Sequence, residues 1–404
     1  MYVRGMVMKE VYLVEANESK TVFAVTGRID SNNATAISDA IIAIWEANPN
    51  EQLVSDMSEL EYISSAGLRI FLTLQKKTPK KIKLINLSEE VYDIFAMTGF
   101  DTILDVHRPI KKVSIDGATK ISQGANGEIF KTDVDTIYKV YQPNTPMEDV
   151  DRERNLAKLA FLKGIPTAIS YDVASLEDGR LAIGFEMLDA DSLSTTIKDN
   201  PDKFDELAKE YVRIYKMFHE MEVEITEFPS AKDIYMEYIN GCVSWYNQEE
   251  IDALRRLVNS IPDRNTLIHG DYHAHNIMYQ NGELIMIDMG DISYGHPIFD
   301  FLATAATQAN LVDLNPAYAE IHTGMPVEYI KRLWNSLLRL YFEGKSEEEI
   351  SAIDKQIRLF SKLKVAFAPV VGRGLPMELI QSSVDDAKIN LIPYIDSMIG
   401  SINW

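Results

Sequence analysis

The sequence predicts a small α/β domain followed by a larger domain with a strand-rich first part and a helical second part. Three observations lead to this prediction. Candidate strands and helices alternate up to about residue 110. Candidate strands then flank a glycine-containing turn. From Phe204 onward, apolar residues recur at helical spacing over long stretches. We therefore expect domains at residues 1–110, 111–188 and 189–404, the last two together forming the larger one.

The composition is that of an ordinary globular protein with a strong negative charge. Hydrophobic residues make up 46% of the chain and charged residues 25%. The net charge of −21 disfavours nucleic acid as a partner, because its phosphates would be repelled. No run of about 18 apolar residues predicts a membrane span, and the polar N-terminus does not resemble a signal peptide. The single cysteine, Cys242, suits a reducing compartment, so we expect a cytoplasmic protein.

The first segment contains strand and helix patterns in alternation. β-branched residues mark the strands, and Gly27 and Asp30 interrupt the second one. Ser31 or Asn32 is expected to cap the first helix, which ends around Pro49. The expected strands lie at residues 11–14, 21–26, 52–55 and 82–86, and the expected helices at residues 36–45, 68–74 and 89–98.

A serine-containing block precedes the second of these helices. It reads D-M-S at residues 56–58 and I-S-S-A-G-L at residues 63–68. Together with the alternation around it, this block resembles the STAS domain of anti-sigma factor antagonists. The resemblance covers almost the whole segment, and it implies an interaction domain with a regulatory protein partner.

In that family, a serine before this helix is phosphorylated within a D-S-[ST]-G-L setting. The matching position here is Ser65, with Ser64 in place of the aspartate and Ala66 in place of the second hydroxyl residue. The resemblance therefore implies phosphorylation of Ser65. A phosphate at a helix N-terminus would meet free N–H groups and the positive end of the helix dipole. The simpler alternative is that Ser65 only caps the helix.

The second segment begins after a basic, proline-containing linker at residues 107–112. Gly124 and Gly127 lie between two candidate strands. Glycines let backbone N–H groups approach a phosphate without a clashing Cβ, although such a pair more often marks an ordinary hairpin. Lys139 lies in the next expected strand, residues 136–141, among apolar and aromatic residues. A lysine in such a strand usually just points to solvent.

The most informative stretch runs from Leu267 to Asp300. Its middle contains two short apolar runs, at residues 277–279 and 283–287, separated by the pair Asn281-Gly282. This pair is typical of a type I′ turn, so the two runs are expected to form a hairpin.

Three polar residues border this expected hairpin. Asn276 and Asp288 lie almost symmetrically about the turn, so we expect the hairpin to bring their side chains together. An amide oxygen and a carboxylate at such a place suit Mg²⁺, which prefers oxygen ligands. Asp271 lies just upstream, where it can accept a proton from an attacking hydroxyl.

The order H-x-D-x-x-x-x-N, a hairpin and an aspartate is the catalytic-loop pattern of kinases. Followed by G-x-P-x-x-D ending at Asp300, it resembles the aminoglycoside phosphotransferase and choline kinase-like family. The sequence departs from the protein kinase pattern by Gly270 in place of arginine and by I-D-M-G-D in place of D-F-G. The resemblance implies a two-lobed protein kinase-like fold with a helical C-lobe. It also implies ATP and Mg²⁺ as cofactors and the hydroxyl of a small molecule as acceptor.

The same resemblance assigns roles to individual residues. Asp271 would be the catalytic base, and Asn276 and Asp288 would bind Mg²⁺. Lys139 would contact the phosphates of ATP, held in place by a carboxylate of the helix expected at residues 147–161.

Glu153 is the favoured partner of Lys139, with Glu148 and Asp151 as alternatives. Residues 185–188 fall where the hinge of a kinase binds the adenine edge through backbone groups. The residues expected to bind the nucleotide are therefore Gly124, Gly127, Lys139, Glu153, Glu186 and Leu188.

Two alternatives concern the chemistry of this segment. His269, His273 and His275 lie close enough in sequence to suggest a zinc site, although the kinase-like pattern explains His269 and His273 without zinc. The kinase-like part could also sense a nucleotide without useful turnover. The protein would then be a regulatory protein of the anti-sigma factor antagonist type.

The acceptor is expected to be a small molecule rather than a protein. Only residues 289–299 separate Asp288 from Asp300, and no A-P-E sequence follows, so the long peptide-binding segment of protein kinases is missing. Acidic residues such as Asp291 would suit a cationic acceptor. The competing hypothesis is that the kinase-like part phosphorylates Ser65 of its own chain, favoured by the high local concentration that tethering gives.

Overall fold

The structure is a computed structural model that describes residues 10–17, 19–50, 52–106, 109–123, 127–372 and 375–404. Its internal contacts divide the chain into two compact units, Met1–Lys111 and Lys112–Trp404. Each unit has its own hydrophobic core and is described by itself. Within the described ranges, no helix is long and apolar enough to cross a bilayer.

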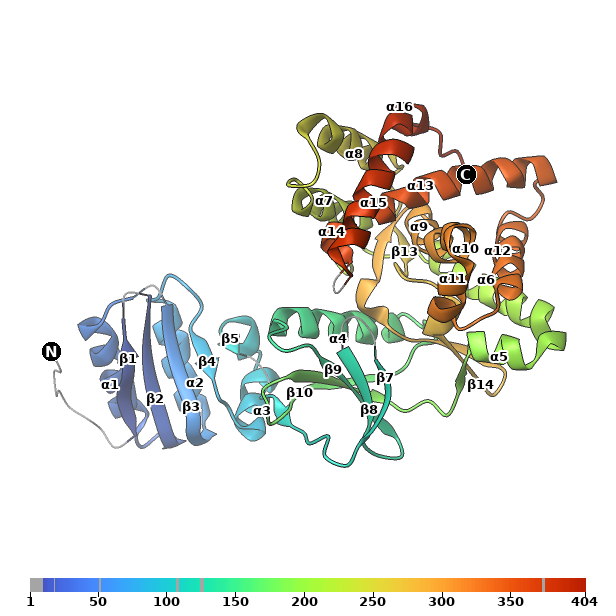
Figure 1. The fold of residues 1–404 in the computed structure, drawn as a ribbon. Helices are drawn as coiled ribbons and strands as arrows, with labels where there is room; N and C mark the ends of the chain where they lie inside the picture. The colour runs from blue at the N-terminus through green and yellow to red at the C-terminus, as the bar shows by residue number, and fades with distance from the viewer. Residues whose placement is uncertain (1–9, 18, 51, 107–108, 124–126, 373–374) are drawn as a thin grey trace. The chain divides into compact units, whose positions relative to one another are not determined.

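The described residues of the first unit form a five-stranded sheet in the order β1-β2-β3-β4-β5 (Figure 1). β1 is antiparallel to β2, and the other neighbours are parallel. Parallel neighbours need crossover connections, which the helices provide. The strands are β1 (Val11–Ala16), β2 (Lys20–Ile29), β3 (Gln52–Ile63), β4 (Lys83–Ile85) and β5 (Asp105–Val106), and the helices are α1 (Ala34–Ala47), α2 (Ser65–Gln75) and α3 (Glu89–Met97).

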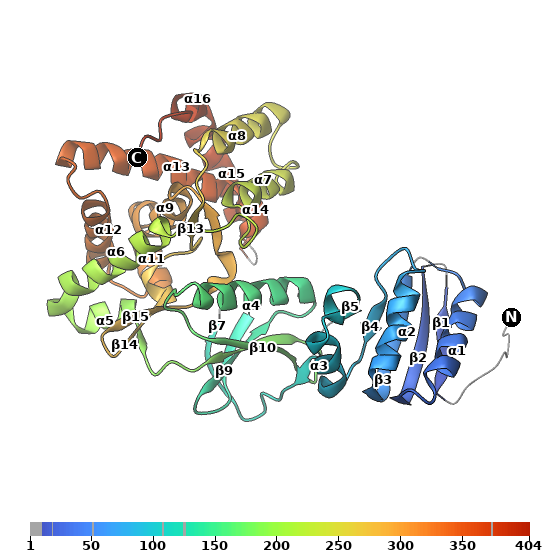
Figure 2. The ribbon, with the colours of Figure 1, turned by 180° about the vertical axis from the view of Figure 1, so that it is seen from behind.

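The core of the first unit lies between the sheet and its helices. Figure 2 shows α1 and α2 in front of the sheet, on the same face. Phe23 of β2, Ile37 of α1 and Phe71 of α2 are all fully buried. The rings of Phe71 and Phe95 meet edge to face, with centroids 6.0 Å apart. The α/β fold predicted for this segment is confirmed.

Two local predictions for the first unit are wrong. The third strand does not end at residue 55, because β3 continues past an irregularity and pairs again with β2, Glu59 opposite Thr26. Polar side chains on the exposed part of β3 hide this continuation in the sequence. The first helix begins at Ala34 and is capped neither by Ser31 nor by Asn32. Asn33 holds the cap position without a side-chain cap bond.

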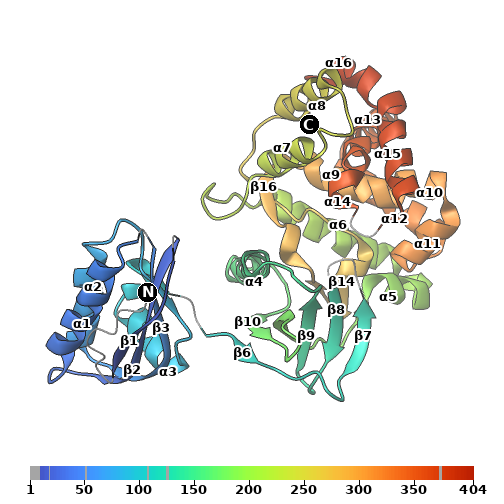
Figure 3. The ribbon, with the colours of Figure 1, turned by 60° about the vertical axis from the view of Figure 1, so that its left-hand side comes forward.

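The first part of the second unit is a sheet with one long helix. Its described strands follow the order β6-β10-β11-β9-β8-β7. Figure 3 shows β7, β8 and β9 side by side, with α4 beside the sheet. The elements are β6 (Lys111–Lys112), β7 (Thr119–Gln123), β8 (Gly127–Lys131), β9 (Thr136–Tyr141), α4 (Met147–Leu162), β10 (Ser170–Ser175) and β11 (Leu181–Glu186).

The second part is mostly helical, which confirms the predicted kinase-like architecture with a helical C-terminal part. Its helices are α5 (Leu193–Asp199), α6 (Phe204–Glu220), α7 (Ala231–Gly241), α8 (Gln248–Ser260), α9 (Ile298–Ala305), α10 (Leu311–Leu314), α11 (Pro316–Thr323), α12 (Val327–Tyr341), α13 (Glu347–Ala366), α14 (Ala368–Val371), α15 (Met377–Asn390) and α16 (Ile395–Met398). Short strands lie among them: β12 (Asp191–Ser192), β13 (Thr266–Ile268), β14 (Ile277–Gln280), β15 (Glu283–Met286) and β16 (Ser293–Gly295).

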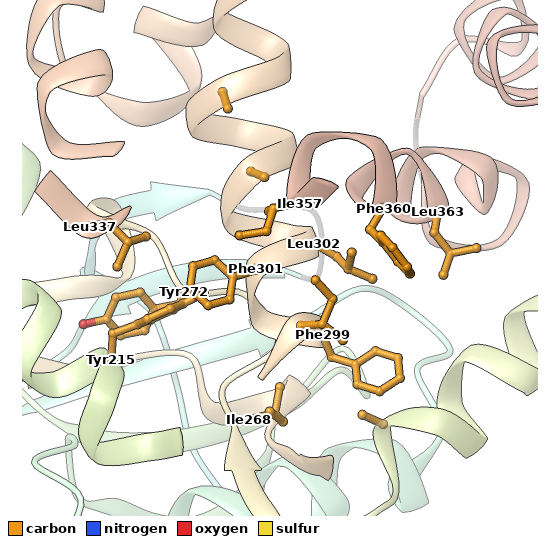
Figure 4. Close-up of a cluster of buried hydrophobic side chains, with 14 of the residues drawn as sticks. Tyr215, Ile268, Tyr272, Phe299, Phe301, Leu302, Leu337, Ile357, Phe360 and Leu363 are labelled. Atoms are coloured by element: carbon orange, nitrogen blue, oxygen red, sulfur yellow. The ribbon is translucent and has the colours of Figure 1, made fainter. Parts of the chain in front are cut away.

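An aromatic cluster lies beneath the segment between β13 and β14. Figure 4 shows Tyr215 of α6, Tyr272 of this segment and Phe301 of α9 packed together. The ring centroid of Tyr215 lies 4.6 Å from that of Tyr272 and 5.1 Å from that of Phe301. Tyr272 is 1% exposed, and its hydroxyl donates to the Tyr211 carbonyl at 2.6 Å. This packing fixes the backbone immediately after Asp271.

Candidate functional site

The hairpin predicted from Asn281-Gly282 is present. β14 and β15 pair antiparallel, and φ is +52° at Asn281 and +93° at Gly282, as a type I′ turn requires. Beyond the strands, the Ile287 N–H donates to the Asn276 carbonyl at 2.9 Å. The hairpin therefore places Asn276 and Asp288 at its two open ends. Their side chains make no hydrogen bond to each other and turn to different partners.

Asn276 contacts the expected catalytic base. Its Nδ2 donates to the Asp271 carbonyl at 3.1 Å and to Asp271 Oδ2 at 3.2 Å, and His273 Nε2 lies 3.4 Å from the same carboxylate oxygen. Partial burial alone would raise the pKa of Asp271. The hydrogen bond and charge of His273, helped by the charge of Lys364, outweigh it and hold this pKa well below its usual range. The Asp271 side chain is 40% exposed, so an ionised carboxylate faces the solvent.

Asp300, the last residue of G-x-P-x-x-D, anchors the loop that carries Asp271. The Asp300 carboxylate is fully buried. It accepts the Gly270 N–H at 2.6 Å and the His269 N–H at 3.0 Å. His219 Nε2 lies 3.0 Å from Asp300 Oδ2, and His219 Nδ1 lies 2.9 Å from the Tyr341 hydroxyl. The motif is therefore a clamp on the backbone of the H-G-D segment.

The glycine within H-G-D has a structural reason. Gly270 has φ of +86°, a region that side-chain-bearing residues rarely adopt. A Cβ at this position would lie 2.6 Å from the Asp291 carbonyl oxygen. The departure from the arginine of protein kinases therefore follows from the close approach of two backbone segments.

Lys139 lies between two carboxylates from distant parts of the chain. Its Nζ is 2.7 Å from Glu153 Oε1 of α4 and 2.9 Å from Asp288 Oδ1. Lys139 and Glu153 are 8% and 9% exposed. Burial alone would lower the pKa of Lys139, but Asp288 and Glu153 together raise it, so the ammonium stays charged. Of the three carboxylates considered in the sequence, Glu153 is the one that pairs with Lys139.

Asp288 adopts an unusual backbone conformation. Its φ is +61° and its ψ is +67°, a left-handed region that costs a non-glycine residue energy. Two contacts accompany this geometry: the ion pair with Lys139 and the close approach of α4 to the next residues. A Cβ on Gly290 would lie 3.2 Å from the Glu153 side chain. The strained turn therefore brings the Asp288 carboxylate against β9 and α4.

Of the two glycines expected to bind phosphate, only Gly127 lies among the described residues. Gly124 lies outside the described residues. Gly127 begins β8, and a Cβ there would lie 2.1 Å from the Val140 carbonyl oxygen on β9. Close strand approach alone therefore accounts for Gly127, and a role in phosphate binding stays a hypothesis.

The expected hinge follows β11. Glu186 turns its side chain toward Ile169, whose N–H donates to Glu186 Oε1 at 2.8 Å. The Met187 N–H donates to the Asp135 carbonyl at 2.9 Å. Leu188 is half-buried, and its N–H has no protein acceptor in the part of the chain that the structure describes. The Glu186 N–H also donates to the Ile169 carbonyl, at 3.0 Å, so the expected adenine contact of this segment stays a prediction.

Ser65 is exposed at the start of α2, in the first unit. It is the first helical residue, and Ser64 holds the cap position without a side-chain cap bond. The alternative that Ser65 merely caps the helix is therefore wrong. The Ser64 hydroxyl oxygen is buried and has no hydrogen-bond partner among the described residues.

The three histidines that follow β13, His269, His273 and His275, have different surroundings. His269 is fully buried, and its Nδ1 accepts the Asp271 N–H at 3.2 Å. The ring of His273 lies 6.4 Å from that of His275 and 6.0 Å from that of His322 on α11. Among the described residues, no three His, Cys, Asp or Glu side chains are grouped as ligands of a metal ion. The proposed pair Asn276 and Asp288 would leave the remaining Mg²⁺ positions to phosphates and water.

Sequence reasoning missed Lys364. This lysine lies on α13, and its Nζ donates to the Gly270 carbonyl at 3.4 Å. No motif signals it, because 94 residues separate the two positions. Only the packing of α13 against α9 brings it to the segment between β13 and β14.

Comparison with known proteins identifies both units. The profile described as "Phosphotransferase enzyme family" matches residues 117–326, about half of the chain, and the STAS domain profile matches residues 12–113. The chain therefore belongs to the phosphotransferase enzyme family, a kinase-like enzyme family, and carries a STAS domain before the phosphotransferase domain. The resemblance found in the sequence is confirmed for both units.

Individual relatives are more distant. The anti-sigma-B factor antagonist of Bacillus subtilis is 27% identical over 96 residues, which cover 23% of this chain and 86% of that protein. Aminoglycoside phosphotransferase APH(2'')-Ib, solved with ADP, is 15% identical, with a TM-score of 0.47 over 69% of this chain and 93% of that one. The gentamicin complex of APH(2'')-IIa is 16% identical, with a TM-score of 0.47 over 77% of this chain and 99% of that one.

We predict that Asp300→Asn destabilises the second unit by about 3 kcal/mol or more. An amide in place of the carboxylate points N–H groups at backbone N–H donors and leaves His219 without its buried partner. Denaturant unfolding measures the loss, and hydrogen exchange should speed up at residues 267–272. Asp313→Asn is the control, because Asp313 is an exposed partner of Arg358. Unchanged exchange at residues 267–272 in Asp300→Asn would contradict the clamp.

Proposed function

We propose that this chain transfers the γ-phosphoryl group of ATP to a hydroxyl group of a small molecule. The observation that carries the proposal is the pair of short contacts that joins Lys139 to Glu153 and Asp288 within one unit that also holds an ionised Asp271. Phosphoryl transfer depends mainly on positioning and on neutralising charge. A fixed ammonium and an ionised base within one unit answer both needs.

Asp271 is the proposed base. Its carboxylate is partly exposed, held by Asn276 Nδ2, and ionised at neutral pH. It would accept a hydrogen bond from the acceptor hydroxyl, orient it toward the phosphorus and take its proton as the new P–O bond forms. Asp300 acts indirectly, because its carboxylate holds the backbone of His269 and Gly270, which precede Asp271.

The donor set fits a magnesium ion. Asn276 uses Nδ2 for its bonds to Asp271, which leaves its amide oxygen available. Asp288 supplies a carboxylate that is 43% exposed. Both are hard oxygen donors of the kind that Mg²⁺ prefers. When bound, Mg²⁺ would neutralise charge on the phosphates.

Lys139 and the segment after β11 would hold the rest of the nucleotide. The Lys139 ammonium is fixed by Glu153, so the α- and β-phosphates would meet a positioned cation. Backbone groups at Glu186 and Leu188 would bind the adenine edge. Gly127, with Gly124, would let the backbone approach the phosphates.

The segment after Asp288 supports a small acceptor. It consists of a short turn at Met289–Asp291 and the strand β16, and α9 then begins at Ile298. An extended platform for a peptide would need more chain than this. The regulatory alternative is nucleotide sensing without turnover. It is less favoured, because sensing alone needs no ionised base at Asp271.

The test of this function is a transfer screen with γ-labelled ATP and Mg²⁺. Small alcohols and aminoglycosides serve as acceptors, and the intact mass of the protein is measured in parallel. Label in a small-molecule fraction supports the proposal. Stoichiometric phosphate on Ser65 that disappears in Asp271→Ala would instead favour phosphorylation of the chain by itself. Nucleotide binding without any transfer would favour the sensing alternative.

We predict different losses for the two central aspartates. Asp271→Ala should lower turnover by roughly 10²-fold or more and leave ATP binding nearly unchanged, because the base does not touch the nucleotide. Asp288→Ala should weaken Mg²⁺-dependent ATP binding and turnover together, since it removes a metal ligand and a partner of Lys139. Calorimetry and the transfer assay separate the two. Glu283→Ala, at an exposed position of the same hairpin, is the matched control. Normal turnover in Asp271→Ala would exclude the proposed base.

We also propose that the STAS domain contacts a regulatory protein and that phosphorylation of Ser65 changes this contact. The Ser65 side chain is exposed at the start of α2, where two negative charges would alter the local surface without disturbing the core. The first unit is a STAS domain, and the matching serine of that family is phosphorylated, which supports the proposal.

Ser65→Asp should change the set of proteins captured from an extract of the source cells, whereas Ser65→Ala should capture the wild-type set. Because Ser65 is exposed and does not hold the cap position of α2, Ser65→Ala should change the free energy of unfolding by no more than about 0.5 kcal/mol. Quantitative mass spectrometry of the captured proteins and denaturant unfolding provide the two measurements. Identical capture by all three forms would leave Ser65 without a switching role.

A further inference from the structure

Lys364 is a lysine without an ion pair beside the proposed base. It is half-buried on α13, and its one hydrogen bond to a described residue, at 3.4 Å, goes to the neutral carbonyl of Gly270. Among the described residues, no carboxylate oxygen lies within 4.0 Å of its Nζ. A partly buried ammonium is costly unless partners compensate it. Lys362, two residues earlier on the same helix, is by contrast paired with Asp386 at 2.9 Å.

The surroundings of Lys364 keep it charged. Burial alone would lower its pKa, but Tyr235, Asp291 and Asp271 act together to raise it. The two aspartates do so through space, beyond ion-pair distance. Lys364 is therefore a permanent cation that stays close to Asp271 without being bound to it.

Two lysines contact residues 269–291 in the part of the chain that the structure describes. Lys139 reaches Asp288, and Lys364 reaches Gly270, whose carbonyl belongs to the peptide bond that leads into Asp271. Lys139 is committed to Glu153 and Asp288 at 2.7 and 2.9 Å. Lys364 forms no ion pair with any residue that the structure describes. The two cations thus flank a segment that carries three aspartates.

We propose that Lys364 binds the phosphoryl group while it is being transferred, on the acceptor side of Asp271. This inference rests on the proposed function. The acceptor oxygen must lie within hydrogen-bond reach of Asp271 and roughly 3–3.5 Å from the phosphorus before it attacks. The phosphoryl oxygens then come close to Asp271, whose negative charge would repel them. An uncommitted ammonium beside Gly270 offsets this repulsion.

The step is an ordinary in-line displacement. A bond forms between the acceptor oxygen and the γ-phosphorus while the bond from the γ-phosphorus to the β,γ-bridging oxygen breaks. The hydroxyl proton goes to Asp271, and ADP leaves with the bond electrons. Lys364 donates hydrogen bonds to the oxygens of the moving group and exchanges no proton.

The test compares a ground-state ligand with a mimic of the moving phosphoryl group in the full chain. Calorimetry measures the binding of ADP with Mg²⁺, and of ADP with Mg²⁺ and aluminium fluoride, to wild type, Lys364→Met, Lys364→Arg and Lys362→Met. Lys364→Met should weaken binding of the aluminium fluoride complex about 10²-fold and leave ADP binding nearly unchanged. Lys364→Arg should recover part of the loss, and Lys362→Met should match wild type.

Each other outcome counts against the proposal in its own way. Equal binding of the aluminium fluoride complex by Lys364→Met and wild type would refute the role of Lys364 and leave the proposed function intact. Parallel loss of both ligands would show a structural role. Failure of wild type to bind the aluminium fluoride complex more tightly than ADP would reject the proposed function, and this inference with it.

Discussion

The arrangement of the second unit depends on one buried ammonium. Lys139 comes from a strand of the sheet, Glu153 from the helix beside it and Asp288 from the end of a hairpin in the helical part. Removing one partner of a buried charge pair costs about 3–5 kcal/mol, because the remaining charge stays desolvated. The contact therefore ties the position of α4 and the strained conformation of Asp288 to the position of β9.

A second buried carboxylate fixes the other half of the site. Asp300 holds two successive backbone N–H groups of the H-G-D segment, and His219 and Tyr341 extend the network into α6 and α12. Beneath it, the rings of Tyr215 and Tyr272 pack at 4.6 Å. These contacts hold the backbone on both sides of Asp271 in place. The partly exposed carboxylate of Asp271 therefore lies next to buried residues, Asp300 and Tyr272, that hold its backbone.

The two units differ in how they present their polar groups. In the STAS domain, Ser65 is exposed at a helix start and makes no cap bond, so the site is a surface that a charge can change. In the phosphotransferase domain, the central charges are partly buried and already have partners within the protein. Lys364 is the exception, as a charged side chain held near the base with one long hydrogen bond.

The sequence by itself determined the α/β and kinase-like architectures and the hairpin around Asn281-Gly282, and it favoured Glu153 as the partner that Lys139 has in the structure. The catalytic and binding roles of Lys139, Asp271 and Asp288 stay predictions. The α/β fold and the hairpin follow from local patterns of periodicity and turn chemistry. The kinase-like architecture and the partner of Lys139 are inferred from the resemblance to a known family. Tertiary structure alone decided the length of β3, the clamp by Asp300 and the approach of Lys364 to Gly270. Each of these depends on contacts between residues far apart in the chain, such as the 94 positions between Gly270 and Lys364. A long-range contact of this kind leaves no periodic or spacing signal, because packing of whole helices, rather than any local preference, sets the distance.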